Sequence, residues 1–477
     1  MQPILATNTE TEESVQLLIE NDHLIVTESL TLTAQSSTVE TKEKVNLEFI
    51  YGIDYTQNLL SVHFIEKQTA VSVSDTGNKT LTNIRPQDIQ WHLRTLRYTL
   101  NDTSFVTQLQ YLALPHLNEL PNTKIVVVLN PTSGLQLAET YWQTIVQPML
   151  VTAGFNESNI SKFMTEGEGK TRALAESVGQ RILSTEEQGP KPIIISIGGD
   201  GTLHEVVNGL KDLGRGDFRL GVIPAGSGNA FALGLNIENV QQATLKIIKA
   251  RKEEPFYLMD VQFGHSNTKE NWQQQIEYDQ LKKPVRLLVI MSWGFHAQIV
   301  SKSRYLRYFM GNKRFSLVAM FLLKFLHQYE GELVLKKSKK YNPELEQFVE
   351  NENDVVLDGR QPNEGFTYFI VSKQHSLEKG FNIAPFASPL TDDVDVVILR
   401  GVDADALTKA SIEAFQGGIH VKSDKVEYYK TTDLLLRVKQ KADVCLDGEI
   451  HSLPANGVLH LRTVGSSTPE SSFTVFV

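Results

Sequence analysis

Apolar runs that end in glycine-containing turns constrain the fold of this chain more than any other feature. Three of them are mostly apolar and lead straight into turn residues: KIVVVLN (124–130), PIIISIGG (192–199) and LGVIPAG (220–226). Such runs are typical of parallel strands buried on both faces of a sheet. Apolar residues recur at helical spacing between and after them, at 142–149 and in 202–213. This alternation predicts a three-layer α/β domain whose ligands lie beyond the carboxyl ends of the strands.

The patterns on either side of this domain are different. Residues 1–120 contain short β-like runs and then a helical stretch, which predicts a β-rich region. It is either a small barrel of pleckstrin-homology type or an extension packed on a later domain. Residues 121–255 form the α/β domain, and 256–477 return to strands, which predicts an antiparallel β-sandwich. Polar stretches around 264–283 and 337–364 lack periodicity and are expected to be loops.

Charge and cysteine content exclude several classes of protein. The chain has 46 basic and 56 acidic residues, a net charge of −10, so no overall electrostatic attraction to nucleic acid is expected. A phosphate ligand would need a local nest of amides instead. Cys445 is the only cysteine, which excludes an intrachain disulfide and suits a reducing compartment. Residues 1–20 do not resemble a signal peptide, so we expect a cytoplasmic, peripherally membrane-associated protein.

The turn after the second apolar run carries the main chemical signal. Glycines in GGDG (198–201) let the backbone approach a ligand closely, and the helix that starts there offers free N–H groups to phosphate oxygens. Asp200 would repel phosphate unless it holds Mg²⁺ or accepts a proton from an attacking hydroxyl. A tight turn capped by Asp200 is the structural alternative. Ser227 and Asn130 lie in the other two turns, and the three turns should lie side by side at one sheet edge.

Several nucleotide-binding motifs are absent. The sequence has no G-x-x-x-x-G-K-[ST] phosphate loop, no G-x-G-x-x-G after the first strand, and no H-R-D or D-F-G of protein kinases. Its histidines lack the spacing of zinc ligands. The glycine turns therefore indicate a different kind of phosphate site.

The sequence resembles a known family at this point. GGDGTLHEVVNG and IPAGSGNA look like the two signature loops of the diacylglycerol kinase catalytic-domain superfamily, and the sphingosine (long-chain base) kinases are the branch they resemble most. WGFHAQ, RYFMGNKRF and CLDGEI extend the resemblance over about 124–465. It implies an ATP-dependent kinase of a lipid hydroxyl, with a nucleotide cleft between the α/β domain and the β-sandwich.

The resemblance also implies roles for individual residues. Asp200 would activate the lipid hydroxyl, and the D-G-E turn with Asp447 and Glu449 would support Mg²⁺. Lipid contacts are expected at Gln298, Trp293 and Phe295. The nucleotide or its phosphates would be held by Asn130, Thr165, Gly198, Gly199, Gly201, Glu205, Ser227, Arg307 and Arg314.

Departures from the family pattern concern charge. The loop after Asn130, often basic in the family, reads TSGL (132–135) here, which would either weaken nucleotide binding or shift the work to Lys170 and Arg172. Long-chain base kinases carry an acid where this chain has Gln298. That leaves the lipid open: a sphingoid long-chain base is favoured by the surrounding motifs, and a neutral lipid such as ceramide or diacylglycerol is the alternative.

Other functions remain as alternatives. An NAD kinase shares the G-G-D-G loop but would not need FSLVAMFLLKFL (315–326), which is apolar on nearly all sides, as in a helix that borders an acyl chain or in a core helix. A lipid-binding scaffold without catalysis is the non-enzyme alternative. Asp392 and Asp393 could hold a structural metal or form a solvated turn. We expect a lipid substrate and membrane contact as partners, and the sequence leaves a homo-oligomer open.

Overall fold

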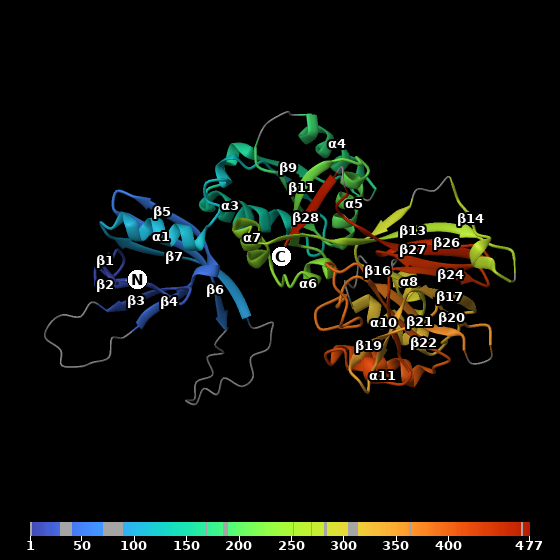
Figure 1. Cartoon of the computed structure of the whole chain (residues 1–477). Helices are drawn as coiled ribbons and strands as arrows, with labels where there is room; N and C mark the ends of the chain where they lie inside the picture. Colours follow the sequence, from blue (N-terminus) through green and yellow to red (C-terminus); the bar gives the residue numbers. More distant parts are fainter. Residues whose placement is uncertain are drawn as a thin grey trace.

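We describe the fold from a computed structural model of the whole chain (Figure 1). It describes residues 2–28, 41–69, 89–167, 169–184, 189–250, 252–268, 270–280, 284–303, 313–361, 364–468 and 471–477. None of the helices within these ranges is long and apolar enough to cross a membrane.

The N-terminal region is an antiparallel sheet followed by a helix. Its strands lie in the order β4-β3-β2-β1-β7-β6-β5, and helix α1 (Thr103–Ala113) comes directly after the last strand in sequence. Their bounds are β1 Ile4–Asn8, β2 Ser14–Glu20, β3 His23–Glu28, β4 Thr41–Asn46, β5 Ile50–Thr56, β6 Leu59–Thr69 and β7 Ile89–Thr99. The predicted β-rich region is confirmed, whereas its likeness to a pleckstrin-homology domain stays a prediction.

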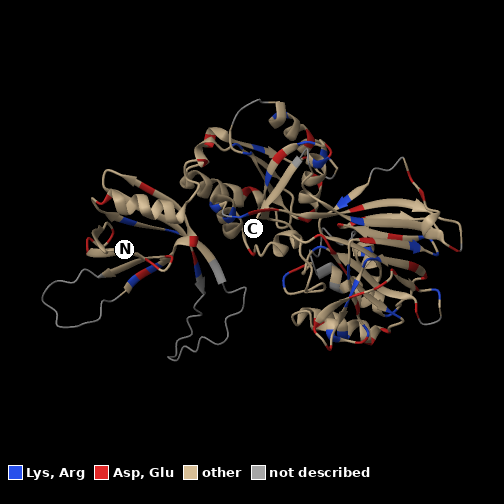
Figure 2. Cartoon of the chain, in the orientation of Figure 1, with Lys and Arg blue, Asp and Glu red and all other residues tan. Residues whose placement is uncertain are grey.

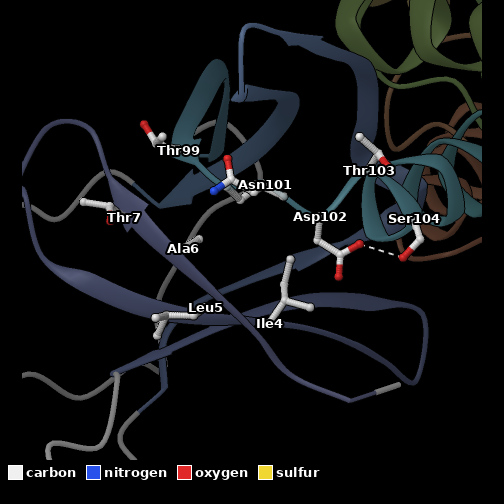
Figure 3. A pocket seen from close by; sticks show the side chains of 10 residues that line it. Ile4, Leu5, Ala6, Thr7, Thr99, Asn101, Asp102, Thr103 and Ser104 are labelled. Carbon is white, nitrogen blue, oxygen red and sulfur yellow. Dashed lines mark hydrogen bonds between the residues drawn. The ribbon is translucent and has the colours of Figure 1, made fainter.

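This region also packs on the α/β domain. Lys249, at the end of α7 (Val240–Lys249), donates from Nζ to the carbonyls of Leu47 and Ala113, at 2.8 and 2.6 Å. A cavity of about 710 Å³ lies on another side of the region, where β1 meets the start of α1 (Figure 3). The region therefore has its own sheet and also packs on a later domain, as the second alternative expected.

The middle of the chain forms the predicted α/β domain. Its sheet has the order β12-β28-β11-β10-β8-β9, and β9, β8, β10, β11 and β28 are parallel. Helices α4 and α5 pack together on one side, and α3 and α7 lie on the other (Figure 1). The strands are β8 Ile125–Leu129, β9 Ile160–Met164, β10 Ile193–Gly198, β11 Gly216–Pro224, β12 Glu253–Pro255 and β28 Ser471–Phe476; the other helices are α2 Ala138–Tyr141, α3 Gln147–Ala153, α4 Thr171–Ser184, α5 Asp200–Lys211 and α6 Ala230–Gly234.

The C-terminal strand corrects the predicted boundary of the third region, 256–477. Strand β28 pairs in parallel with β11 and so belongs to the α/β sheet instead of the sandwich. Phe473 and Val475 are buried there, with exposed fractions of 1% and 0%. Local pattern could not reveal this return, because the run reads equally well as a strand of either domain.

The rest of the third region is the predicted antiparallel sandwich. One sheet has the order β14-β13-β27-β24-β17-β20, with β15 also paired to β13, and the other β19-β18-β23-β22-β21-β16-β25-β26. The strands are β13 Tyr257–His265, β14 Glu277–Tyr278, β15 Val285–Leu287, β16 Ile290–Gly294, β17 Gly331–Lys336, β18 Lys339–Asn342, β19 Gln347–Glu350, β20 Val355–Asp358, β21 Phe366–Ser372, β22 Val394–Arg400, β23 Glu427–Thr431, β24 Asp433–Val438, β25 Ala442–Leu446, β26 Glu449–Leu453 and β27 Gly457–Gly465. Stretch 337–364, expected to be a loop, instead carries β18, β19 and β20, because paired edge strands need not be apolar.

Three helices accompany the second sheet. Helix α8 (Phe295–Ser303) packs on β16, β21 and β25, and α10 (Lys313–Leu323) packs on α8. Helix α11 (Ala404–Phe415), which the sequence analysis did not predict, begins at an N-cap formed by Asp403. Helix α8 therefore lies between the second sheet and α10.

The acidic turn at Asp392 and Asp393 contains a cation supplied by the chain itself. Lys373, fully buried after β21, donates from Nζ to the carbonyls of Thr391 (2.5 Å) and Asp393 (2.7 Å). Burial lowers the pKa of Lys373 to about 8, although the charges of Asp393 and Asp395 raise it. Asp392 is exposed. The ammonium group thus already uses two oxygens that a structural metal would need.

Replacing this ammonium should destabilise the sandwich. Lys373→Met leaves two partly buried carbonyls without their donor and removes a buried charge from the acidic turn, so we expect the free energy of unfolding to fall by about 3 kcal/mol. Thermal melting measures this, with exposed Lys379→Met as the matched control. EDTA should leave the melting temperature of the unaltered protein unchanged. Equal melting of the two variants would contradict the role of Lys373.

Candidate functional site

Three glycine loops meet at the carboxyl edge of the parallel sheet, as the sequence predicts. They follow β8, β10 and β11 and comprise residues 130–134, 198–201 and 224–229. A Cβ atom added to Gly226 would lie 2.2 Å from the Cα of Gly199, and one added to Gly134 would lie 2.7 Å from the carbonyl oxygen of Ala225. Gly134 also has a φ of +54°. Only glycine permits these contacts, so the three loops form one continuous backbone surface.

Asp200 joins two of these loops. It is the first residue of α5, its N–H donates to the Gly228 carbonyl (3.0 Å), and its carboxylate accepts from the N–H groups of Ala230 (2.8 Å) and Phe231 (3.1 Å) at the start of α6. Burial raises the pKa of Asp200 to about 6, which the two amides oppose and the charge of Asp447 reinforces. Asp200 therefore does not cap its own helix α5, as the structural alternative expected, but caps the start of α6, and its carboxylate has increased basicity.

The predicted nucleotide residues of the first two loops lie on adjoining strand ends. Thr165 follows β9 and donates its N–H to Leu129 (2.9 Å), the residue before Asn130. The Asn130 side chain donates to Thr202 Oγ1 (2.9 Å). Thr202 directly follows the loop that contains Gly198, Gly199 and Gly201. These contacts bring the residues to one edge, where an incoming nucleotide would meet their amides and hydroxyls.

Glu205 has a structural contact that the resemblance did not imply. Its carboxylate accepts from the backbone N–H groups of Gly169 (3.3 Å) and Arg172 (3.2 Å), at the start of α4. It therefore shapes the loop between Thr165 and α4. The Arg172 side chain binds Asp212 (Nε–Oδ2 2.8 Å), and Lys170 Nζ binds the exposed Glu166 (3.2 Å), so both basic side chains of this loop already have a carboxylate partner.

Two predicted arginines cannot be placed in full. Arg307 lies outside the described residues, and of Arg314 only the backbone, in α10, is described. Ser227 lies within the third glycine loop, between Gly226 and Gly228. The positions of these residues relative to a nucleotide stay predictions.

Asp447 does not fit the metal role that its D-G-E turn predicted. Its side chain is 1% exposed and accepts four hydrogen bonds, from the backbone N–H groups of Leu288 (2.7 Å), Val289 (3.0 Å) and Ile290 (2.8 Å) and from His204 Nδ1 (2.9 Å). Burial alone would lower the pKa of His204, but the bond and charge of Asp447 raise it. Asp447 therefore fastens the sandwich to α5.

The remaining carboxylates suit a metal that arrives with phosphates. No group of three or more metal-binding side chains occurs within the ranges that the structure describes. Glu449 is largely exposed, with 63% of its side chain accessible, and lies near enough to affect the His204 pKa. Mg²⁺ commonly binds one or two carboxylates together with substrate phosphates. Glu449 is a candidate for such a carboxylate.

The predicted lipid residues divide between two layers. Trp293 is 1% exposed and packs between the two sheets, 5.3 Å from the Phe366 ring, so it belongs to the sandwich core. Phe295 and half-buried Gln298 lie on α8, on the other side of the second sheet. Gln298 is thus the more accessible of the three, and its contact with a lipid stays a prediction.

The sequence analysis missed the polar contacts between the domains. His204 lies four residues after Asp200, and that spacing places both on one face of α5, which was the available signal. Arg286 Nη1 donates to Asp212 Oδ1 (3.0 Å) just after α5, and His375 Nε2 lies 3.0 Å from the Leu233 carbonyl of α6. No local motif marks these two residues, because their partners are far away in sequence.

Comparison with known families agrees with this site. Residues 124–261 match the diacylglycerol kinase catalytic domain, and residues 337–462 match the YegS C-terminal NAD kinase beta sandwich-like domain. The first match contains all three glycine loops. The second covers much of the sandwich, including Asp447.

Individual relatives are lipid kinases by name. The candidate lipid kinase YtlR of Bacillus subtilis is 28% identical over 72% of this chain and 96% of its own length. Human sphingosine kinase 1 is 29% identical over 44% of this chain and 51% of its own length, so the match spans about half of that relative. A diacylglycerol kinase structure from Bacillus anthracis is similar with a TM-score of 0.44 and 15% identity, covering 74% of this chain and 96% of that one.

These matches cover the glycine loops and most of the sandwich, whose Asp447 binds His204 of α5. Residues 124–261 therefore form a diacylglycerol kinase catalytic domain, and the similarity of the chain to lipid kinases supports an ATP-dependent kinase.

Proposed function

We propose that this protein transfers the γ-phosphate of ATP to the hydroxyl of a sphingoid long-chain base. The observation that carries the proposal is the single backbone surface of the three glycine loops, with the Asp200 carboxylate at its centre. Phosphoryl transfer depends mainly on positioning and charge stabilisation, which such a surface supplies to phosphates. The sphingoid base is favoured by the motifs shared with sphingosine kinases.

Asp200 acts as the base in this proposal. The carboxylate accepts the proton of the lipid hydroxyl while the hydroxyl oxygen attacks the γ-phosphorus. The bond from the γ-phosphorus to ADP breaks, and ADP leaves. The α6 amides hold both carboxylate oxygens, which fixes the orientation of the group. Mg²⁺ bound to the ATP phosphates would neutralise charge, with Glu449 as an available ligand.

A neutral lipid is the second candidate substrate. Gln298 offers an uncharged amide where an ammonium group would favour an acid, and residues 299–314 contain no Asp or Glu. An amide can bind an amide-linked acyl chain as well as an ammonium group. Ceramide or diacylglycerol would then replace the sphingoid base, with the same chemistry at Asp200.

A panel assay tests the reaction and its base together. Labelled ATP is incubated with a long-chain base, ceramide, diacylglycerol and NAD. We expect label in the long-chain base, and Asp200→Asn should lower that kcat at least about 100-fold, because proton transfer is lost. ATP affinity should remain. Label in NAD alone would overturn the lipid proposal, and failure to bind ATP would favour a scaffold.

The raised pKa of Asp200 predicts an acid limit to activity. The base must be deprotonated, and burial raises its pKa from the usual 3.8 to about 6. The kcat/KM should therefore fall as the pH drops through about 6, while circular dichroism shows an intact fold. Constant kcat/KM down to pH 5 would contradict a base in this environment.

We propose that the enzyme takes its substrate from a lipid bilayer through α10 and the segment after it. Leu317, Met320, Phe321 and Phe325 have exposed fractions of 45%, 61%, 61% and 59% and follow helical spacing. Acidic and basic residues are interspersed along the α/β domain and the sandwich (Figure 2). An acidic protein with such an apolar face would bind bilayers by insertion more than by charge.

Removing this face should separate membrane binding from catalysis. Phe321→Ser with Phe325→Ser should weaken binding to neutral phosphatidylcholine vesicles at least about tenfold, since each buried aromatic ring contributes up to about 3 kcal/mol. Activity on a short-chain soluble substrate should persist. Exposed Phe415→Ser on α11 is the control. Unchanged vesicle binding, with loss of a concentration-dependent dimer, would assign the face to a second copy of the chain.

A further inference from the structure

Polar side chains interrupt an otherwise apolar layer beneath α8. Ser292 on β16 is fully buried, and Tyr368 on the neighbouring strand β21 is 5% exposed. The register pairs Tyr368 with Gly294 and Ser292 with Ile370, so both side chains belong to one face of the sheet. Helix α8 packs on both strands. The neighbours of this group on the same face, such as Ile370 and Leu399, are apolar.

His296 of α8 completes the group. Its Nδ1 lies 2.8 Å from Ser292 Oγ, and its ring meets the Tyr368 ring edge to face, with centroids 6.0 Å apart. The Tyr368 hydroxyl is buried and, within the described part of the chain, has no hydrogen-bond partner. A buried hydroxyl without a partner is unfavourable and uncommon in folded proteins. Its position beside His296 indicates a ligand that supplies the missing bond.

The group lies along the strand that leads away from the catalytic junction. β16 begins at Ile290, whose N–H donates to Asp447, and Asp447 binds His204, one helical turn after Asp200. Ser292 is two residues farther on the same face, which is about 7 Å at the usual rise of a strand. A lipid whose reacting hydroxyl lies at Asp200 and whose tail follows β16 would pass Ser292, His296 and Tyr368.

The chemistry of the group selects an uncharged ligand. Burial lowers the pKa of His296 to about 4 and raises the pKa of Tyr368, so both side chains are neutral at physiological pH. A neutral imidazole and a phenol can each donate or accept one hydrogen bond. A hydroxyl can satisfy both at once, since it also donates one bond and accepts others. An ammonium or phosphate group would find no opposite charge on these three side chains.

We propose that Tyr368 and His296 bind a second hydroxyl of the lipid substrate, farther along the lipid than the one that is phosphorylated. The inference rests on the proposed lipid kinase activity and adds a specificity-determining pair to it. The Tyr368 hydroxyl, which has no hydrogen-bond partner among the described residues, binds the lipid hydroxyl. Ser292 orients the His296 ring. The pair would favour a long-chain base with a free secondary hydroxyl over an otherwise identical lipid that lacks it.

Two substrates and two variants test the proposal. The kcat/KM for phosphoryl transfer is measured with a saturated long-chain base and with its 3-deoxy analogue. We expect the unaltered enzyme to prefer the hydroxylated base about tenfold, the effect of one good hydrogen bond. Tyr368→Phe should bring this ratio close to one by lowering only the rate with the hydroxylated base. Tyr429→Phe is the control, because Tyr429 lies in the same sheet but its hydroxyl already binds Glu427 (3.0 Å).

Each other outcome has a defined meaning. Equal loss with both lipids in Tyr368→Phe would show a structural role and overturn the inference, as would an unchanged ratio. An unaltered enzyme that phosphorylates both lipids equally would also overturn it while the proposed function stands. Activity with neither lipid would instead reject the sphingoid base substrate, and the inference with it.

Discussion

The buried carboxylate of Asp447 is the interaction on which the arrangement of this enzyme depends. It accepts three backbone N–H groups at the start of β16 and a fourth hydrogen bond from His204 on α5. A buried charge is tolerated only when it is fully hydrogen-bonded, and here those bonds come from both domains. The helix that begins at the proposed base is thereby fixed to the strand that leads to the lipid motif. The position of Asp200 relative to a bound lipid follows from this contact.

The close approach of the glycine loops is a second constraint on the position of Asp200. Gly199 and Gly226 approach so closely that no side chain fits between them, and Asp200 then bonds to α6 across the contact. The Asp200 carboxylate consequently has two functions. It holds two loops together as a helix cap, and its partial burial makes it a stronger base than an exposed aspartate. In this site, the stability of the loops and the proposed proton transfer depend on the same carboxylate.

Local patterns predicted the elements of this fold better than the contacts between them. The α/β domain and the sandwich follow from runs such as 192–199, and the meeting of the glycine loops follows from the geometry of parallel strands. The hydrogen bond between Asp447 and His204 joins residues 243 positions apart, and neither the D-G-E turn nor the helix after GGDG indicates that pairing. Lys373 at the acidic turn and the return of β28 to the first sheet were missed for the same reason. Each depends on a partner that no short sequence window contains.

The return of β28 also explains how α5 is held at its second end. The chain crosses between the domains at Phe256 and again at Ser466, and these two residues bond to each other, with Ser466 N–H donating to the Phe256 carbonyl (2.7 Å) and Phe256 N–H to Ser466 Oγ (2.9 Å). Lys211, the last residue of α5, donates from Nζ to the Ser466 carbonyl (2.6 Å). Burial lowers the pKa of this lysine. Helix α5 is therefore fastened to the junction by His204 near its start and by Lys211 at its end, so it cannot tilt relative to the sandwich without breaking one of these bonds. The proposed reaction would gain from such a double attachment, because it would bring a nucleotide held by the α/β domain and a lipid held by the sandwich to one carboxylate.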